Sequence, residues 1–182
     1  MNFFTFLFFA IIASIESVRW SDCGGENAIG VLNDVQLEPN PIKAGNYIKA
    51  GAKVQLYRQF PNDTIGKLEM WKVYRVFGLI RFNIPFVCVG ERCKGKICDL
   101  LTIPRVCEEV QKINSRYSLN VTCDCNTFAP GHYQAYDYDY LLPSVPTAFA
   151  WIASGDYYVK GQLLAPDGKQ LGCAQGEGFL AV

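Results

Sequence analysis

Cysteine is the residue that most constrains how this chain can fold, because it occurs eight times and never before residue 23. The eight are Cys23, Cys88, Cys93, Cys98, Cys107, Cys123, Cys125 and Cys173. An even set of cysteines behind an export signal predicts a framework of disulfides. The simplest arrangement ties the two ends of the chain together through Cys23 and Cys173 and places three bridges in the central cluster. Spacing alone leaves the pairings open.

A metal site is the other common use of clustered cysteines. Structural zinc favours two closely spaced Cys or His pairs, whereas here four residues separate Cys93 from Cys98, one separates Cys123 from Cys125, and His132 is the only histidine. In an extended segment Cys123 and Cys125 lie on one face, too far apart to bond to each other, so each should bond to another cysteine. We therefore expect disulfides, with no metal ion and no cofactor.

The N-terminal segment has the features of an export signal. Residues Asn2 to Ala13 are nearly all apolar, no charged side chain precedes Glu16, and the run is too short to span a bilayer. The segment lacks the usual Lys or Arg at its start, and the alternative is a buried first strand or helix. We expect residues 1–17 to be a signal peptide and residues 18–182 to form one domain in the secretory pathway.

Two sequons support the same compartment. Asn62 in Asn62-Asp63-Thr64 and Asn120 in Asn120-Val121-Thr122 are expected to carry glycans at the surface. The formal net charge is zero, which argues against a nucleic-acid partner. Abundant Tyr and Phe with scattered Gly and Pro favour a β-rich domain with many turns.

The hydrophobic pattern predicts a mostly β domain with one short helix. Alternation predicts strands over residues 29–37, 68–76, 81–89 and 133–142, a strand pair over 47–60 with a turn at Ala50-Gly51, and a hairpin joining 157–164 to 170–174 through Pro166-Asp167-Gly168. In the 133–142 strand, Tyr136, Tyr138 and Tyr140 should share one face. Residues 97–101 form a helical turn or loop. The one clear helix begins at Pro104 and ends at Asn114-Ser115.

The motifs of common catalytic sites are missing from the sequence. His132 is the only histidine, with no G-x-S-x-G nucleophile motif beside it, and oxidised cysteines cannot act as nucleophiles. Asp137 and Asp139 form a carboxylate pair typical of a solvated strand face. We therefore expect a protein that is not an enzyme, and a small hydrolase remains the weakest of the hypotheses.

Apolar side chains in a proline-bounded loop give the clearest functional signal. Phe149, Trp151 and Ile152 follow Pro143 and Pro146 in a segment that should be a loop. Uncharged aromatic residues in an exposed loop are typical of contact with a membrane interface. The alternative is that Phe149 and Trp151 pack on the core.

The second half of the chain resembles the ganglioside GM2 activator family. The motifs are Ile84-Pro85, Cys88, Cys93, residues 97–101 (ICDLL), Cys123-Asp124-Cys125, residues 130–133 (PGHY), residues 150–157 (AWIASGDY) and residues 168–173 (GKQLGC). The start at Asp22-Cys23-Gly24 is similar to that of the wider MD-2-related lipid-recognition (ML) family. This resemblance implies an antiparallel β-cup around an apolar cavity. It also implies a non-enzymatic protein, lysosomal or extracellular, that extracts a glycolipid from a membrane and presents it to a lysosomal hexosaminidase-type glycosidase.

The resemblance also assigns individual residues. It implies the disulfides Cys23–Cys173, Cys88–Cys93, Cys98–Cys125 and Cys107–Cys123. Trp151 corresponds to the family's membrane-contact tryptophan, with Phe149 and Ile152 beside it. The other membrane-facing aromatic has no tryptophan here, and Leu79, Ile80 and Phe82 occupy that region.

Three function classes follow from these observations. The first is a protein that binds and transfers a lipid or glycolipid and touches membranes transiently, with a sterol or phospholipid carrier of the same family as its alternative. The second is a secreted interaction module whose interior is filled by its own side chains. The third is the small hydrolase.

Overall fold

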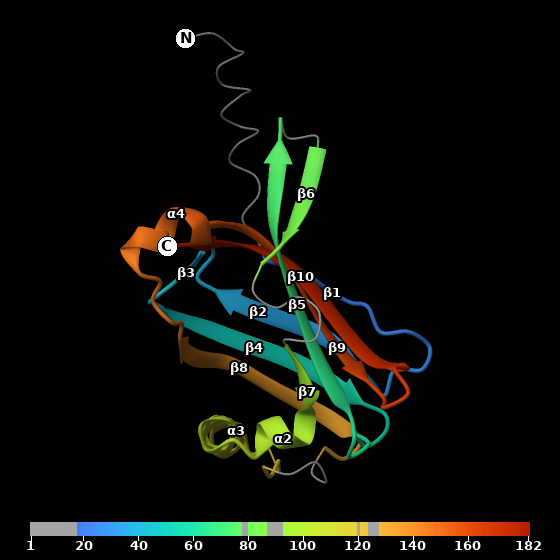
Figure 1. Cartoon of the computed structure of the whole chain (residues 1–182). Coiled ribbons are helices and arrows are strands. Elements are labelled where there is room, and N and C mark those ends of the chain that lie inside the picture. Colours follow the sequence, from blue (N-terminus) through green and yellow to red (C-terminus); the bar gives the residue numbers. More distant parts are fainter. Residues whose placement is uncertain (1–17, 78–79, 87–92, 120, 124–127) are drawn as a thin grey trace, which may run out of the picture.

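Two β-sheets packed face to face form the body of the protein in the computed structural model (Figure 1). The structure describes residues 18–77, 80–86, 93–119, 121–123 and 128–182. The predicted signal peptide at 1–17, Leu79, Cys88, Asn120 and Cys125 lie outside the described residues. The predicted mostly antiparallel β fold with few short helices is confirmed.

The larger sheet has seven strands, in the order β1-β10-β9-β5-β6, with β3 paired to β10 and β7 paired to β5. These strands are β1 (Arg19–Asp22), β3 (Ile42–Lys43), β5 (Ile65–Val76), β6 (Ile80–Pro85), β7 (Lys94–Lys96), β9 (Gly155–Leu164) and β10 (Gln170–Ala181). All neighbours are antiparallel except β3 and β10. The predicted hairpin at Pro166-Asp167-Gly168 joins β9 to β10, with Gly168 at φ 84° in the turn.

The smaller sheet has three strands in the order β2-β4-β8, namely β2 (Gly30–Glu38), β4 (Tyr47–Leu56) and β8 (Gly131–Leu141). The predicted turn at Ala50-Gly51 is wrong, because β4 continues through both residues and Gly51 pairs with Gln36. A Cβ atom at Gly51 would lie 2.6 Å from Cδ1 of Tyr136. The glycine therefore makes room for a tyrosine ring and does not mark a turn.

A bulge in β8 changes which tyrosines share a face. The pairing shifts between Ala50, opposite Tyr138, and Ala52, opposite Ala135, and Asp137 has φ 57°. Tyr138 therefore lies on the inner face, whereas the hydroxyl of Tyr136 donates to Asp34 Oδ2 at 3.3 Å on the other face of the sheet. The prediction that Tyr136 shares the face of Tyr138 and Tyr140 is wrong, because one extra residue reverses the alternation.

The helices are α2 (Ile97–Leu101), α3 (Pro104–Tyr117), the 3-10 turn η3 (Thr147–Phe149) and α4 (Ala150–Ala153). α3 begins at Pro104 as predicted but runs past Asn114 and Ser115 to a left-handed cap at Ser118, φ 53°. The Asn114 side chain accepts the Val121 N–H at 3.2 Å, so it holds the following loop and does not end the helix. No helix in the described part of the chain is both long and apolar enough to cross a bilayer.

Disulfides join both the ends of the chain and its centre. Cys23 bonds to Cys173 across 150 residues, and Cys107 bonds to Cys123 across 16. These are two of the pairs that the resemblance implies. Cys93 and Cys98 are disulfide-bonded as well, so neither is a thiolate that could bind a metal. Their expected partners, Cys88 and Cys125, lie outside the described residues.

Candidate functional site

A cavity of about 900 Å³ lies between the two sheets. It occupies the end of the sandwich where β5 and β10 begin and β9 ends, beside α2 and α3 (Figure 1). Its walls are almost entirely apolar and include Leu32, Val54, Leu56, Leu68, Leu100, Val110, Ile113, Leu163 and Leu171. A volume in the range of about 300–1,000 Å³ is typical of sites for small organic ligands.

The cavity exists because one wall carries almost no side chains. Gly161 of β9 and Gly172 and Ala174 of β10 face it from the larger sheet. A Cβ atom added to Gly161 would find no neighbour closer than 4.0 Å, the carbonyl oxygen of Ala174. The sequence shows these glycines, but only the pairing of β9 with β10 brings them to one place.

The polar side chains at the cavity wall are engaged with the protein itself. Asp22 accepts the Gly24 N–H at 2.7 Å and the Leu32 N–H at 2.9 Å. Gln162 donates to Gln170 at 2.9 Å. Within the described ranges, no buried side-chain nitrogen or oxygen lacks a hydrogen-bond partner. The wall therefore favours apolar chains over polar ligands.

Helix α3 closes one side of the cavity with Val110 and Ile113. It lies alongside β8 (Figure 1), where the Tyr138 hydroxyl donates to Glu109 and the Tyr117 hydroxyl donates to the Tyr136 carbonyl oxygen. The hydrogen bond to Glu109 raises the pKa of Tyr138 to about 12. Hydrogen bonds from Lys112 and then from Tyr138 hold the pKa of Glu109 below its usual value. The contact between α3 and β8 is thus polar and keeps its proton on the tyrosine.

The residues predicted to touch a membrane lie at the opposite end of the sandwich. Trp151 is 78% exposed and Phe149 58%, so neither packs in the core, and Ile152 lies beside them on α4. Ile80 and Phe82 are exposed on β6. The structure brings these residues to the end away from α2 and α3, and none of them lines the cavity (Figure 1).

The β5–β6 hairpin adds residues that sequence reasoning missed. On the face that continues the inner side of the sheet, Tyr74 and Val76 of β5 and Ile84 of β6 are exposed beside Ile80 and Phe82, and Phe77 is 92% exposed at the turn. Period-two alternation could have shown this face. We call the surface formed by Tyr74, Val76, Phe77, Ile80, Phe82, Ile84, Phe149, Trp151 and Ile152 the apolar end.

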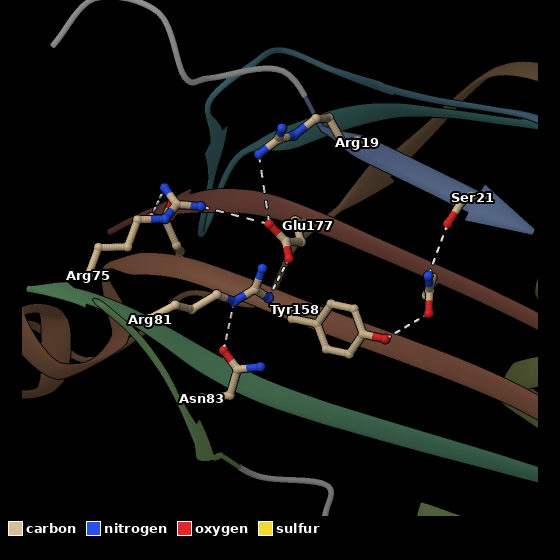
Figure 2. Close-up of polar contacts among 9 residues, drawn as sticks. Arg19, Ser21, Arg75, Arg81, Asn83, Tyr158 and Glu177 are labelled. Atoms are coloured by element: carbon tan, nitrogen blue, oxygen red, sulfur yellow. Dashed lines mark hydrogen bonds and ion pairs between the residues drawn. The ribbon is translucent and has the colours of Figure 1, made fainter. Parts of the chain in front are cut away.

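An ion-pair cluster occupies the outer face of the larger sheet. Figure 2 shows Arg19, Arg75 and Arg81 converging on Glu177 of β10. Arg75 also pairs with Asp156 at 3.2 Å. The cluster joins β1, β10, β9 and the hairpin, and faces away from the cavity.

Comparison with known proteins places the chain in a family. Residues 17–177 match the family model of the ML domain, whereas no curated protein sequence matches. Two similar solved structures are a Niemann–Pick type C2 protein from Japanese carpenter ant and chicken MD-1 complexed with lipid IVa. The first has 12% identity over 89% of this chain and 98% of that chain, with a TM-score of 0.44. The second has 12% identity over 88% and 96%, with a TM-score of 0.34. Because the family model spans most of the chain, this protein belongs to the ML domain family, whose members bind lipids.

Proposed function

We propose that this protein binds the apolar chains of a lipid in the cavity between its sheets and carries that lipid to and from membranes. The observation that supports this most is the apolar cavity of about 900 Å³. Each CH₂ group moved from water into it would contribute about 0.8 kcal/mol. An open interior of this size also argues against a module whose interior is filled by its own side chains.

Contact with the membrane is proposed for the apolar end. Exposed aromatic residues without neighbouring charges suit the bilayer interface, and Trp151 and Phe77 are the most exposed of them. Asn62 is exposed in the loop between β4 and β5, at the cavity end, where Lys96 pairs with Asp63 at 2.8 Å. A glycan on Asn62 would therefore point away from a membrane bound by the apolar end.

The finer proposal is an activator of the GM2 type in the lysosome or outside the cell. In that role the protein would lift a glycolipid from the bilayer and present its headgroup to a hexosaminidase-type glycosidase, without turning it over itself. The motifs around Cys123, Trp151 and Cys173 support this form of the proposal. A sterol or phospholipid carrier is the alternative, and it uses the same cavity.

Native mass spectrometry tests the proposal. The protein is purified from secreting cells without detergent and then incubated with vesicles that contain phosphatidylcholine, cholesterol and a neutral glycosphingolipid. A bound lipid supports the carrier, and its mass decides between the glycolipid, sterol and phospholipid forms. A chain that stays bare contradicts it. Adding a hexosaminidase tests the activator role, which requires faster glycolipid hydrolysis with the protein than without it.

A further inference from the structure

Lys72 is a charged side chain in an unusual place. It lies on β5 and is only 7% exposed, and no other charged residue in the described part of the chain is classed as buried. Strand alternation puts it on the same face as Leu68, which lines the cavity. A buried ammonium group is costly unless it is paired, so its surroundings require an explanation.

The partners of the Lys72 ammonium group are all formally neutral. It donates to the carbonyl oxygens of Ile152 and, at 2.7 Å, of Ser154, at the C-terminal end of α4. The Tyr74 and Tyr157 rings lie 5.5 and 6.0 Å from Nζ. No ion pair joins Lys72 to a carboxylate in the part of the chain that the structure describes. An ammonium group has three N–H donors, and the two carbonyls use two of them.

The backbone next to Lys72 leaves room for this arrangement. Gly155 follows Ser154 with φ 146°, which disfavours any other residue. A Cβ atom there would lie 2.9 Å from Lys72 Cε and 3.4 Å from Nζ. Glycine at this position therefore permits the lysine to reach the end of α4.

Lys72 stands between the apolar end and the cavity. Leu68, Met70, Lys72 and Tyr74 follow one another on the inner face of β5; Leu68 lines the cavity, whereas Tyr74 belongs to the apolar end. Four residues of strand separate Leu68 from Lys72, a distance of about 13 Å. A lipid with its chain in the cavity and its headgroup toward the apolar end would pass directly over the ammonium group.

We propose that Lys72 binds the headgroup of a lipid with an anionic oxygen, in a phosphate, sulfate or carboxylate, and so selects anionic over neutral lipids. The inference rests on the proposed lipid-binding function. The anionic oxygen accepts the third N–H and supplies the missing counter-charge. The apolar surroundings strengthen this ion pair because little water screens it.

Competition between lipids tests the assignment. Wild-type protein and the Lys72→Met, Lys72→Arg and Lys53→Met variants are incubated with vesicles of equal parts phosphatidylcholine, phosphatidylglycerol and a neutral glycosphingolipid, and the bound lipids are counted by native mass spectrometry. Lys53 is exposed on β4 and serves as the matched control. A hydrogen bond to a charged group predicts about a tenfold preference of the wild-type protein for phosphatidylglycerol. Lys72→Met should lose this preference, whereas Lys53→Met should keep it.

The other arms separate the explanations. Lys72→Arg keeps the charge and should keep part of the preference, which shows that charge and not packing is responsible. Wild-type protein that binds all three lipids equally, or a Lys72→Met variant that folds and still prefers phosphatidylglycerol, overturns the inference but leaves lipid binding intact. Protein that binds no lipid at all overturns the proposed function together with it. Glycerol phosphate alone should not bind; if it binds as tightly as the lipid, the site serves a soluble anion and the lipid assignment is wrong.

Discussion

Arg75 and Arg81 stand directly opposite each other across the β5–β6 hairpin. Two like charges in opposed positions destabilise a strand pair. Glu177 of β10 pairs with both of them, and with Arg19 of β1 at 3.8 Å (Figure 2). This carboxylate therefore relieves the repulsion and fastens the hairpin to the body of the sheet.

Removal of the Glu177 carboxylate should loosen the hairpin. Glu177→Ala leaves Arg75 and Arg81 opposed with Asp156 as the remaining acidic partner of Arg75. We expect the free energy of unfolding to fall by about 1 kcal/mol, the upper range for partly exposed ion pairs. Hydrogen exchange should speed up in β6 more than in β8. Glu26→Ala, an exposed glutamate far along β1–β2, is the control, and equal exchange rates in both variants would contradict the role of Glu177.

The contact between α3 and β8 should tolerate acid. The pKa of Glu109 lies below its usual 4.5, so its contribution to stability is complete above that value and is lost only as the pH falls below it. The pKa of Tyr138 is raised from 10 to about 12, so its contribution is complete below pH 10 and is lost as the pH rises toward 12. Protection of α3 against hydrogen exchange, corrected for intrinsic rates, should be the same at about pH 5 and pH 8. A drop in protection at the lower pH would contradict this account.

The hydroxyl of Tyr138 should be the group that matters in that contact. Tyr138→Phe removes the donor to Glu109 while keeping the ring. We expect a loss of about 1 kcal/mol in the free energy of unfolding and faster exchange in α3. Tyr140→Phe, on the same strand, is the matched control. If both variants unfold at the same urea concentration as the wild type, the hydrogen bond contributes nothing.

Trp151 should be needed at the membrane and not in the cavity. Trp151→Ala removes a large exposed aromatic from the apolar end, which should slow extraction of lipid from vesicles about tenfold, given the free energy of burying such a side chain. Tyr57→Ala removes an exposed aromatic at the cavity end and should leave the rate unchanged. Lipid already bound should stay bound in both variants. Unchanged extraction by Trp151→Ala would show that α4 does not contact the membrane.

The two described disulfides should differ in their effect on stability. In the chain-entropy model, Cys23–Cys173, which spans 150 residues, stabilises the fold by about 5 kcal/mol, and Cys107–Cys123, which spans 16, by about 3 kcal/mol. Replacing both cysteines of a pair by alanine and measuring urea unfolding compares the two. A larger loss from the shorter bridge would show that local packing around α3 outweighs loop closure.

Local sequence patterns predicted much of the fold. Alternation located most of the strands, Pro166-Asp167-Gly168 marked the β9–β10 turn, and Pro104 marked the start of α3. These features depend on a few neighbouring residues. The errors came from longer-range contacts. Gly51 reads as a turn until Tyr136, on another strand, packs over it, and Tyr136 itself changes face because of the bulge at Asp137.

The site was harder to predict than the fold. Trp151 could be identified because an aromatic in a proline-bounded loop is unusual in itself. The cavity depends on Gly161 and Gly172 meeting across β9 and β10, and the burial of Lys72 depends on α4, 80 residues further along the chain. No local pattern contains such pairings, because they are set by the packing of the whole sandwich.

The account depends most on the cavity being a lipid site, and Gly161→Leu tests this directly. The leucine side chain would fill space that is now empty above the cavity floor, with no close neighbour to displace. Lys160→Leu places the same side chain one residue earlier, on the outer face, and is the control. By native mass spectrometry after incubation with lipid vesicles, Gly161→Leu should lose bound lipid while its unfolding midpoint stays the same or rises, and Lys160→Leu should load like the wild type. Full loading of a folded Gly161→Leu variant would show that the lipid lies elsewhere and would contradict the account.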